Sequence, residues 1–349
     1  MHVPDGFIDA PVSVAAGAVA AGAVAVSLRG ARRELDERTA PLAGLVAAFI
    51  FAVQMLNFPV AAGTSGHLLG GALAAILVGP YTGVLCISVV LLMQGILFAD
   101  GGLTALGVNI TVMGVVTVLV SYGIFRGLVK ALPRGRRTVT IASFVAALVS
   151  VPAAACAFTA IYAVGGTTDV PVGKVLTAMA GVHVLIGIGE AVITMLTVGA
   201  VVAVRPDLVH GARGLAAPLK LRVGGALVDA PAAHPAPVAA RPPRAIWATG
   251  LVTALVLAGF VSFYASASPD GLEKVAADKG IDKKAEEHAS KDSPLADYGV
   301  RDIADPRVSG GLAGVIGVGV TVVAGTGIFW SVRRRQTKDA GPAHVPDAV

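Results

Sequence analysis

The sequence predicts an all-α polytopic membrane protein of about nine transmembrane helices, a seven-helix body followed by a two-helix tail. Composition is the first observation behind this prediction. The 349-residue chain is 55% hydrophobic and only 14% charged, whereas a soluble domain carries roughly 25% charged residues. Long apolar runs are the second observation, and most approach the roughly 20 residues that cross a bilayer as a helix.

The apolar runs lie at about 11–28, 42–56, 68–79, 81–99, 105–125, 139–164, 174–204, 246–265 and 311–331. The run at 68–79 is short and ends at Gly79-Pro80, which predicts a broken or partial span. The first run has no basic stretch in front of it and is followed by basic residues, so we interpret it as a retained helix and not as a cleaved signal. Cys86 and Cys156 lie within apolar runs, which favours two buried small side chains over a disulfide.

Basic residues predict how the chain is oriented, because Lys and Arg concentrate on the cytoplasmic side. Clusters follow the first, fifth, seventh and last predicted helices, at 29–38, 126–137, 205–244 and 333–335. All four basic clusters lie on the cytoplasmic side if the N-terminus is extracytoplasmic and 68–79 counts as a crossing. The segments then expected outside are 1–10, 57–67, 100–104, 165–172 and 266–308. The C-terminus is expected in the cytoplasm.

A Pro/Ala-rich segment, 206–244, divides the chain into a seven-helix membrane domain, 1–205, and a tail, 245–349. Its prolines and lack of helical periodicity predict an extended cytoplasmic linker. The tail contains two apolar runs joined by an extracytoplasmic loop at about 266–308. In that loop Ser268, Pro269 and Asp270 resemble a helix start, and the charged residues after them predict a short exposed helix.

The N-terminal dipeptide offers an α-amine, the His2 amide and the His2 imidazole on consecutive atoms of the chain. Met1 is expected to be retained, because removal of an initiator Met requires a small second residue. Amine, amide and imidazole nitrogens in a plane suit Ni(II) and Cu(II), and Co(II) can use the same donors. The amide must lose its proton, so binding should fail as protons compete. The His2 ring nitrogen nearest the backbone is the expected ligand, because it closes a chelate ring.

His67 ends the run Gly63-Thr64-Ser65-Gly66-His67 and falls on the same predicted side as Met1 and His2. Irregular backbone at membrane depth is tolerated only where it is buried in protein or lines a cavity. Such a loop could therefore carry His67 inward as a fourth nitrogen ligand. Two alternatives remain open: an ordinary surface turn, and a histidine bonded only to backbone.

Further polar residues are candidates for supporting or coupling roles: Asp5, Asn57, Thr64, Ser65, Gln94, His183 and Glu190. Asp5 could hold the turn made by Pro4 and Gly6 or orient a ligand. For Asn57 and Gln94, hydrogen bonding in helix packing is the favoured interpretation. His183 and Glu190 share a helix face in the seventh run, where ionisable groups are costly and usually functional. A structural or coupling role is favoured for both over metal ligation.

Two absent motifs narrow the function. Gly173-Lys174 is followed by Val175, and Thr168 stands where a phosphate-binding loop needs its first glycine, so ATP hydrolysis by that route is excluded. The HExxH pattern of zinc proteases does not occur. The chain is therefore expected not to be an enzyme, and it needs an external source of energy for active transport.

Several motifs resemble a known family, at 1–7, 57–60, 63–71, 98–107, 181–183 and 189–191. These are MHVPDGF, NFPV, GTSGHLLGG, FADGGLTALG, GVH and GEA. They are similar to the CbiM/NikM proteins, the substrate-binding (S) components of energy-coupling factor transporters for cobalt and nickel. In the tail, Pro269-Asp270-Gly271-Leu272-Glu273 resembles the CbiN/NikN component, or PDGLE domain. The resemblance implies that the Met1 amine, the His2 amide and side chain, and the His67 side chain bind the metal. It also implies two separately encoded ATP-binding subunits and a transmembrane coupling (T) protein.

The predicted function is metal capture for ATP-driven import of nickel or cobalt across a prokaryotic cell membrane, with cobalamin biosynthesis as one use of the cobalt. The metal is the transported ligand, and no permanent cofactor is expected. The expected partners are the transporter subunits and membrane lipid, and no nucleic acid partner is expected. The tail is expected to assist metal loading or closure of the site. Two rivals remain: an autonomous proton-coupled transporter with His183 and Glu190 as its relay, and a structural membrane subunit. The planar nitrogen set leans towards nickel without deciding the metal.

Overall fold

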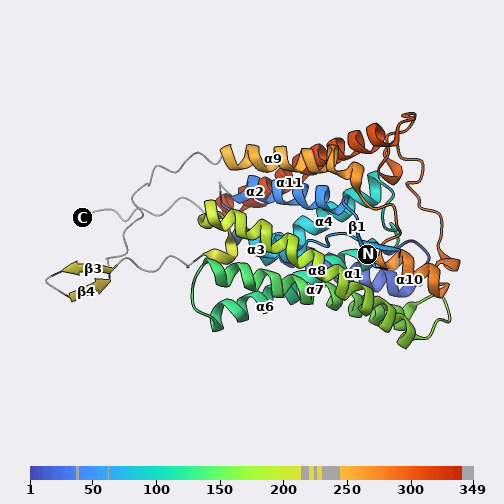
Figure 1. The fold of residues 1–349 in the computed structure, drawn as a ribbon, viewed down its shortest axis with the longest axis horizontal. Helices are drawn as coiled ribbons and strands as arrows, with labels where there is room; N and C mark the ends of the chain where they lie inside the picture. Colours follow the sequence, from blue (N-terminus) through green and yellow to red (C-terminus); the bar gives the residue numbers. More distant parts are fainter. Residues whose placement is uncertain (37–38, 62, 214–219, 224–225, 230–243, 340–349) are drawn as a thin grey trace.

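The computed structural model describes residues 1–349 except 37–38, 62, 214–219, 224–225, 230–243 and 340–349. Its helices run side by side along the long axis of the molecule (Figure 1). Seven of the described helical segments are long and apolar enough to cross a membrane. The predicted class, an all-α polytopic membrane protein, is confirmed.

The α-helices in chain order are α1 (Ala10–Glu34), α2 (Thr39–Gln54), α3 (Gly71–Val78), α4 (Pro80–Leu97), α5 (Leu106–Asn109), α6 (Thr117–Ala131), α7 (Arg136–Gly165), α8 (Val172–Val204), α9 (Arg244–Gly259), α10 (Gly271–Lys279) and α11 (Pro306–Asp339). A π-helical stretch, Ile110–Val116, joins α5 and α6 into one span, Leu106–Ala131. Strands β1 (Phe58–Ala61) and β2 (Thr64–Gly66) form one antiparallel hairpin, and β3 (Lys220–Val223) and β4 (Ala226–Asp229) form another. Short 3₁₀ turns lie at Pro206–Leu208, His210–Ala212, Val261–Tyr264, Asp282–Lys284 and Ala296–Tyr298.

Two of the nine predicted crossings are shorter than a full span, as the sequence predicts for 68–79. Helix α2 has 16 residues and α3 only 8, against the roughly 20 needed to cross lipid. Every residue of α3 is buried in protein, so this segment need not match the thickness of the bilayer. It ends at Gly79, close to the carboxylate of Glu34 at the end of α1. That carboxylate accepts a 2.7 Å hydrogen bond from the Thr82 N–H and thereby caps α4.

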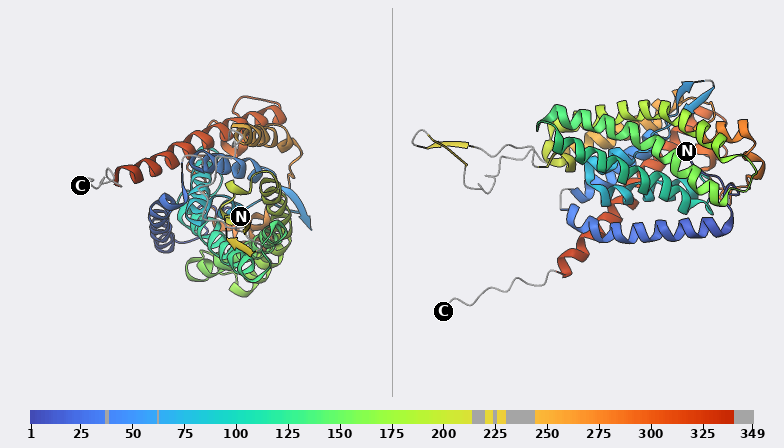
Figure 2. Two further views of the ribbon diagram at one scale, coloured as in Figure 1. Left: turned by 90° about the vertical axis from the view of Figure 1, so that its left-hand side faces the viewer. Right: turned by 90° about the horizontal axis from the view of Figure 1, so that it is seen from below.

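The two long tail helices lie against the body. Helix α11 packs along α2 and α9, on the side of the bundle away from α6 and α7 (Figures 1 and 2). Gly314 of α11 lies so close to the Ala258 carbonyl of α9 that a Cβ atom would collide with it. Small residues that permit such approach are typical of helix contacts in membranes. Tail and body therefore share one core, which includes Phe51 of α2 and Phe329 of α11.

Three expectations about exposed segments and cysteines were wrong. The start of the predicted extended linker forms 3₁₀ turns against the bundle, where Val209 is fully buried and the Tyr122 hydroxyl lies 3.1 Å from His210 Nε2. The rest of the linker outside the β3–β4 hairpin lies beyond the described residues. Helix α10 is not simply exposed, because its apolar residues, led by Leu272, pack against α8. Cys86 is buried as expected, but Cys156 faces outward.

The segments predicted to share the extracytoplasmic side meet at one end of the bundle. Backbone hydrogen bonds join them in pairs: Gly102 N–H to Val3 O (2.8 Å), Thr167 N–H to Phe7 O (3.2 Å), Ser65 N–H to Pro269 O (2.8 Å) and Glu286 N–H to Asp5 O (3.0 Å). The N-terminus lies in the middle of this group (Figure 1). Body loops and tail loop thus build one structure around the first residues of the chain.

Candidate metal centre

The first three residues form a buried strand-like segment inside the bundle. Met1 is 2% exposed and Val3 is completely buried. The Asn109 side chain holds Val3 from both sides, because its Oδ1 accepts from the Val3 N–H at 2.7 Å and its Nδ2 donates to the Val3 carbonyl at 3.1 Å. A buried backbone needs such partners. They place the α-amine of Met1 at a defined point in the interior.

Asp5 holds the turn that follows, as one of its two predicted roles requires. Its carboxylate accepts from the Thr104 N–H at 2.8 Å and from the Leu103 N–H at 3.3 Å. Gly6 has φ +84°, and a Cβ atom there would collide with the carbonyl oxygen of Lys284. Only glycine adopts this conformation without strain and leaves room for the tail loop. The N-terminal turn is therefore built to contact both the body and the tail.

His67 reaches the same point from the β1–β2 hairpin, which turns inward as predicted. Its side chain is buried, and its Nδ1 lies 3.0 Å from the Leu68 carbonyl oxygen, which can only accept a hydrogen bond. That contact places the ring proton on Nδ1 and leaves the lone pair of Nε2 facing the Met1 amine, with which it is in hydrogen-bond contact. The two alternatives for His67, a surface turn and a purely backbone-bonded role, therefore do not describe this geometry.

His2 stacks on His67, with ring centroids 5.0 Å apart and an angle of 17° between the planes. Its Nδ1, the nitrogen expected to bind metal, lies 3.2 Å from Asp100 Oδ1, and its Nε2 lies 3.2 Å from Gln94 Oε1. Burial lowers the pKa of His2 to about 4, although the nearby Asp100 carboxylate acts in the opposite direction. The neutral imidazole, the form that binds metals, is therefore favoured at neutral pH.

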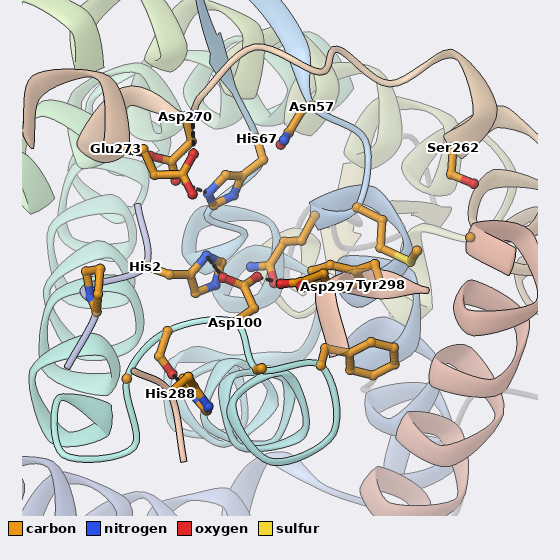
Figure 3. Close-up of a pocket in the computed structure, with 18 of the residues that line it drawn as sticks. His2, Asn57, His67, Asp100, Ser262, Asp270, Glu273, His288, Asp297 and Tyr298 are labelled. Atoms are coloured by element: carbon orange, nitrogen blue, oxygen red, sulfur yellow. Dashed lines mark hydrogen bonds and ion pairs between the residues drawn. The ribbon is translucent and has the colours of Figure 1, made fainter. Parts of the chain in front are cut away.

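Asp270 enters the same cluster from the tail (Figure 3). Its Oδ2 lies 2.6 Å from the Met1 nitrogen and 3.4 Å from His67 Nε2. Burial by itself would raise the pKa of Asp270, but the Met1 ammonium beside it holds this pKa well below its usual value. Ligand atoms of His2, His67 and Asp270 all lie within 4.8 Å of one another. The centre therefore combines nitrogen donors from the body with one carboxylate from the tail.

The remaining predicted residues surround the cluster without entering it. Gln94 contacts His2, as described above. Ser65 donates its hydroxyl to the Ser268 carbonyl at 2.7 Å, Thr64 is buried beside it in β2, and Asn57 accepts from the Ser266 N–H at 2.7 Å through its backbone carbonyl. These three residues belong to the hairpin and its contacts with the tail. None of them contacts the Met1 amine.

His183 and Glu190 are both completely buried in α8. The carboxylate of Glu190 accepts from the Leu69 N–H at 2.6 Å and from the Gly70 N–H at 3.2 Å, at the start of α3. His183 Nδ1 lies 2.8 Å from the Met179 carbonyl oxygen within the same helix. Glu190 therefore accepts hydrogen bonds from the backbone N–H groups of Leu69 and Gly70, which follow His67 in the chain.

Three residues at the centre were not proposed from the sequence as site residues. Asp100 stands within the ADGG motif, Asn109 is a side-chain amide in an apolar run, and Asp270 is predicted only as a helix start and as part of the motif that resembles the PDGLE domain. Asn109 adjoins the π-helical stretch, and such stretches are frequent at functional sites. Tyr298 of the tail completes the set, because its hydroxyl donates to Asp100 Oδ2 at 2.6 Å.

A cavity of about 570 Å³ opens beside the cluster, between the body and the tail loop. Six carboxylates line it together with one arginine: Asp5, Asp100, Asp270, Glu273, Glu286, Asp297 and Arg307. A cleft lined by one sign of charge attracts the opposite ion. The donor set suits a divalent transition metal, since neutral imidazole and amine nitrogens are typical ligands of such ions.

Comparison with known proteins identifies the family. Residues 2–208 match the family described as the cobalt uptake substrate-specific transmembrane region, CbiM. The chain belongs to this family. Residues 244–334 match the PDGLE domain. The resemblance found in the sequence motifs is thereby confirmed for both parts.

Individual relatives of this CbiM-family chain include fused proteins. A putative fused nickel transport protein NikMN of Archaeoglobus fulgidus is 41% identical over 212 residues, covering 60% of this chain and 68% of the relative. The fused nickel transport protein NikMN of Rhodobacter capsulatus is 34% identical over 244 residues, covering 65% and 70%. A crystal structure described as a truncated transition metal transporter superimposes with a TM-score of 0.51 at 27% identity, covering 58% of this chain and 99% of that one.

Proposed function

We propose that this CbiM-family chain captures Ni(II) or Co(II) for import, with the Met1 amine, the His2 amide and imidazole, and the His67 imidazole as ligands. One observation carries the proposal above all. The amine and the two rings converge in a buried cluster although Met1 and His67 come from different parts of the chain. Their nitrogens are of the types that bind nickel, copper and cobalt.

The surroundings support metal capture from the end of the bundle where the loops meet. The acidic cavity beside the cluster would concentrate cations before they reach the nitrogens. The Leu68 carbonyl fixes the tautomer of His67, which is how proteins orient a metal-binding imidazole. With the basic clusters at the opposite end, this end would face the outside of the cell.

Import against a gradient requires an energy source, and the chain carries no phosphate-binding loop. We therefore propose that two ATP-binding subunits and a transmembrane coupling protein drive the transport, as in energy-coupling factor transporters. Reconstitution of the chain with and without these partners tests this part of the proposal. ATP-dependent uptake of radioactive nickel or cobalt is expected only with the partners present.

The autonomous proton-coupled alternative is less well supported. Both carboxylate oxygens of Glu190 are occupied by backbone N–H groups, which fits a structural role. Robust metal flux through the isolated chain under a proton gradient would favour this alternative and exclude a strict need for the ATP-binding subunits.

The position of the α-amine offers the sharpest test of the ligand set. Two forms of the full chain can be released from a cleavable fusion, one beginning at Met1 and one with three glycines before it. The three glycines move the amine out of the chelate and leave both histidines in place, whereas a single glycine would create a new nickel chelate from the amine, two amides and the His2 imidazole. Calorimetry with Ni(II) and Co(II) is expected to show tight binding only for the form beginning at Met1. Equal affinity of the two forms would refute the proposed ligands.

A further inference from the structure

The carboxylate of Asp270, a tail residue, lies closer to the proposed metal ligands than its role in capping α10 requires. Its Oδ2 is 2.6 Å from the Met1 nitrogen and 3.4 Å from His67 Nε2. Two donors bound at right angles to one ion, each at about 2.1 Å, lie about 3.0 Å apart. The spacing of Asp270 from both proposed ligands is therefore close to that of groups sharing one metal ion.

The two oxygens of this carboxylate have separate partners. Oδ1 accepts from the backbone N–H groups of Leu272 at 2.7 Å and Glu273 at 2.9 Å, and so caps α10. Oδ2 makes no helix contact and lies beside the Met1 amine and the His67 imidazole (Figure 3). Capping alone would not require Oδ2. One oxygen thus holds the side chain in place, and the other remains available to the centre.

The backbone around Asp270 is fixed to the structure that carries His67. Ser65, which lies just before His67, binds the Pro269 carbonyl through its N–H at 2.8 Å. On the other side, Gly271 packs so closely on α8 that a Cβ atom there would lie 2.7 Å from Ile186 Cδ1 and 3.1 Å from His183 Cε1. Both neighbours of Asp270 are therefore docked on the body, and the carboxylate cannot shift freely relative to His67.

Charge balance favours the same role. A divalent ion bound by a deprotonated amide, an amine and two neutral imidazoles carries a net charge of about +1, which is costly in a buried site. The Oδ2 oxygen of Asp270 would neutralise it. The other carboxylate nearby, Asp100, accepts from the Tyr298 hydroxyl through Oδ2, and it is not part of the group His2, His67 and Asp270 whose ligand atoms lie within 4.8 Å of one another.

We propose that Asp270 of the tail is a fifth, oxygen ligand of the transported metal ion. The metal site is then composite: the body supplies the nitrogens and the PDGLE segment supplies a carboxylate. Binding of metal replaces the direct contact between Asp270 and the Met1 ammonium, and the protons of the ammonium and of the His2 amide pass to solvent. A five-coordinate site also tolerates Co(II) and Ni(II) alike, whereas four planar nitrogens favour Ni(II).

This inference rests on the proposed function, and the test separates the two. The full chain beginning at Met1 is loaded with Ni(II), and its X-ray absorption edge and its affinity are measured. Asp270→Asn keeps the cap on α10, because Asn caps as well as Asp, but replaces Oδ2 by a group that does not bind metal. Asp278→Asn is the matched control, since it removes one carboxylate from α10 at an exposed position that does not line the cavity. His67→Ala tests the proposed nitrogen set.

The expected result is a five-coordinate edge for the parent chain, a square-planar edge for Asp270→Asn and at least about tenfold weaker binding in that variant. Asp278→Asn should match the parent. A square-planar edge in the parent chain itself overturns the proposal without reliance on any variant. Weak binding by His67→Ala with parent-like behaviour of Asp270→Asn would reject Asp270 and retain the nitrogen site. Unchanged binding in both variants would reject the proposed function as well.

Discussion

Asn109 binds both backbone polar groups of Val3, accepting from its N–H at 2.7 Å and donating to its carbonyl at 3.1 Å. This pair is the main link between the N-terminal residues and the span Leu106–Ala131. A side-chain amide placed in this way acts like a neighbouring β-strand. It determines how far the Met1 amine reaches into the bundle.

Replacement of Asn109 by Leu is expected to weaken Ni(II) binding by about tenfold, because orientation of ligands by supporting residues is worth that much. The buried Val3 N–H loses its acceptor, at a cost of about 1–3 kcal/mol. Calorimetry and thermal unfolding in detergent measure the two effects. Thr111→Val in the same span is the control, since Thr111 bonds only to the Ala16 carbonyl. Parent-like affinity of Asn109→Leu would show that Val3 needs no such anchor.

Glu190→Gln is expected to lower stability rather than to abolish transport selectively. The amide can serve only one of the Leu69 and Gly70 N–H groups with its oxygen, and the other becomes a buried unsatisfied donor, which costs about 1–3 kcal/mol. Thermal unfolding of the purified variant measures the loss. A variant of unchanged stability that transports no metal would instead support a proton relay.

Tyr298→Phe should loosen the tail loop without removing its apolar packing. The ring stacks on Phe98 at 4.9 Å, and this contact survives the change. The hydrogen bond to Asp100 is lost, at about 1 kcal/mol. Burial raises the pKa of Tyr298 well above its usual value, so the hydroxyl remains a donor across the working pH range. Faster amide hydrogen exchange around Tyr298 is the expected result, with Tyr264→Phe, an exposed tyrosine, as the control.

Acidification is expected to release the 3₁₀ turn that contains His210 from the bundle. Burial, together with Arg213 and Arg126, lowers the pKa of His210 to about 4 from an ordinary value of 6.5. The docked state therefore favours the neutral ring, and docking is fully stable above pH 6.5. It weakens as the pH falls from 6.5 towards 4, since only the undocked histidine takes up a proton there.

Limited proteolysis after Arg213 as a function of pH measures this release. His210→Gln retains a polar side chain that does not titrate, so cleavage of this variant should not increase over the same pH window. If both chains gain the same sensitivity on acidification, another group is responsible.

The sequence predicted the spans and the meeting of Met1, His2 and His67, because hydropathy and basic clusters determine which loops share a side. The short run 68–79 and its end at Gly79-Pro80 predicted a partial span, but not that α3 has only 8 residues. Gly70, with φ +87°, and Gly79, with φ +103°, bound this helix, and backbone conformation of that kind has no signature in composition.

There is also a physical reason why the sequence did not reveal Asp270 and Asn109 as site residues. Asp270 is a good helix cap by residue type, and nothing in the sequence places its second oxygen beside Met1. Asn109 could have been suspected as a lone amide in an apolar run, but its partner is a backbone group. Contacts between a side chain and a distant backbone leave no pattern of spacing.

Covalent fusion of the tail to the body changes how strong their docking must be. Tethered segments meet at an effective concentration in the millimolar range when a flexible linker is short enough. A loop that binds the body with a dissociation constant of about 0.1 mM would therefore be docked most of the time in this chain. The same loop on a separate polypeptide would dissociate at ordinary cellular concentrations. Substitutions at the contact between Ser65 and Pro269 should accordingly be far more damaging when the two parts are expressed as separate polypeptides.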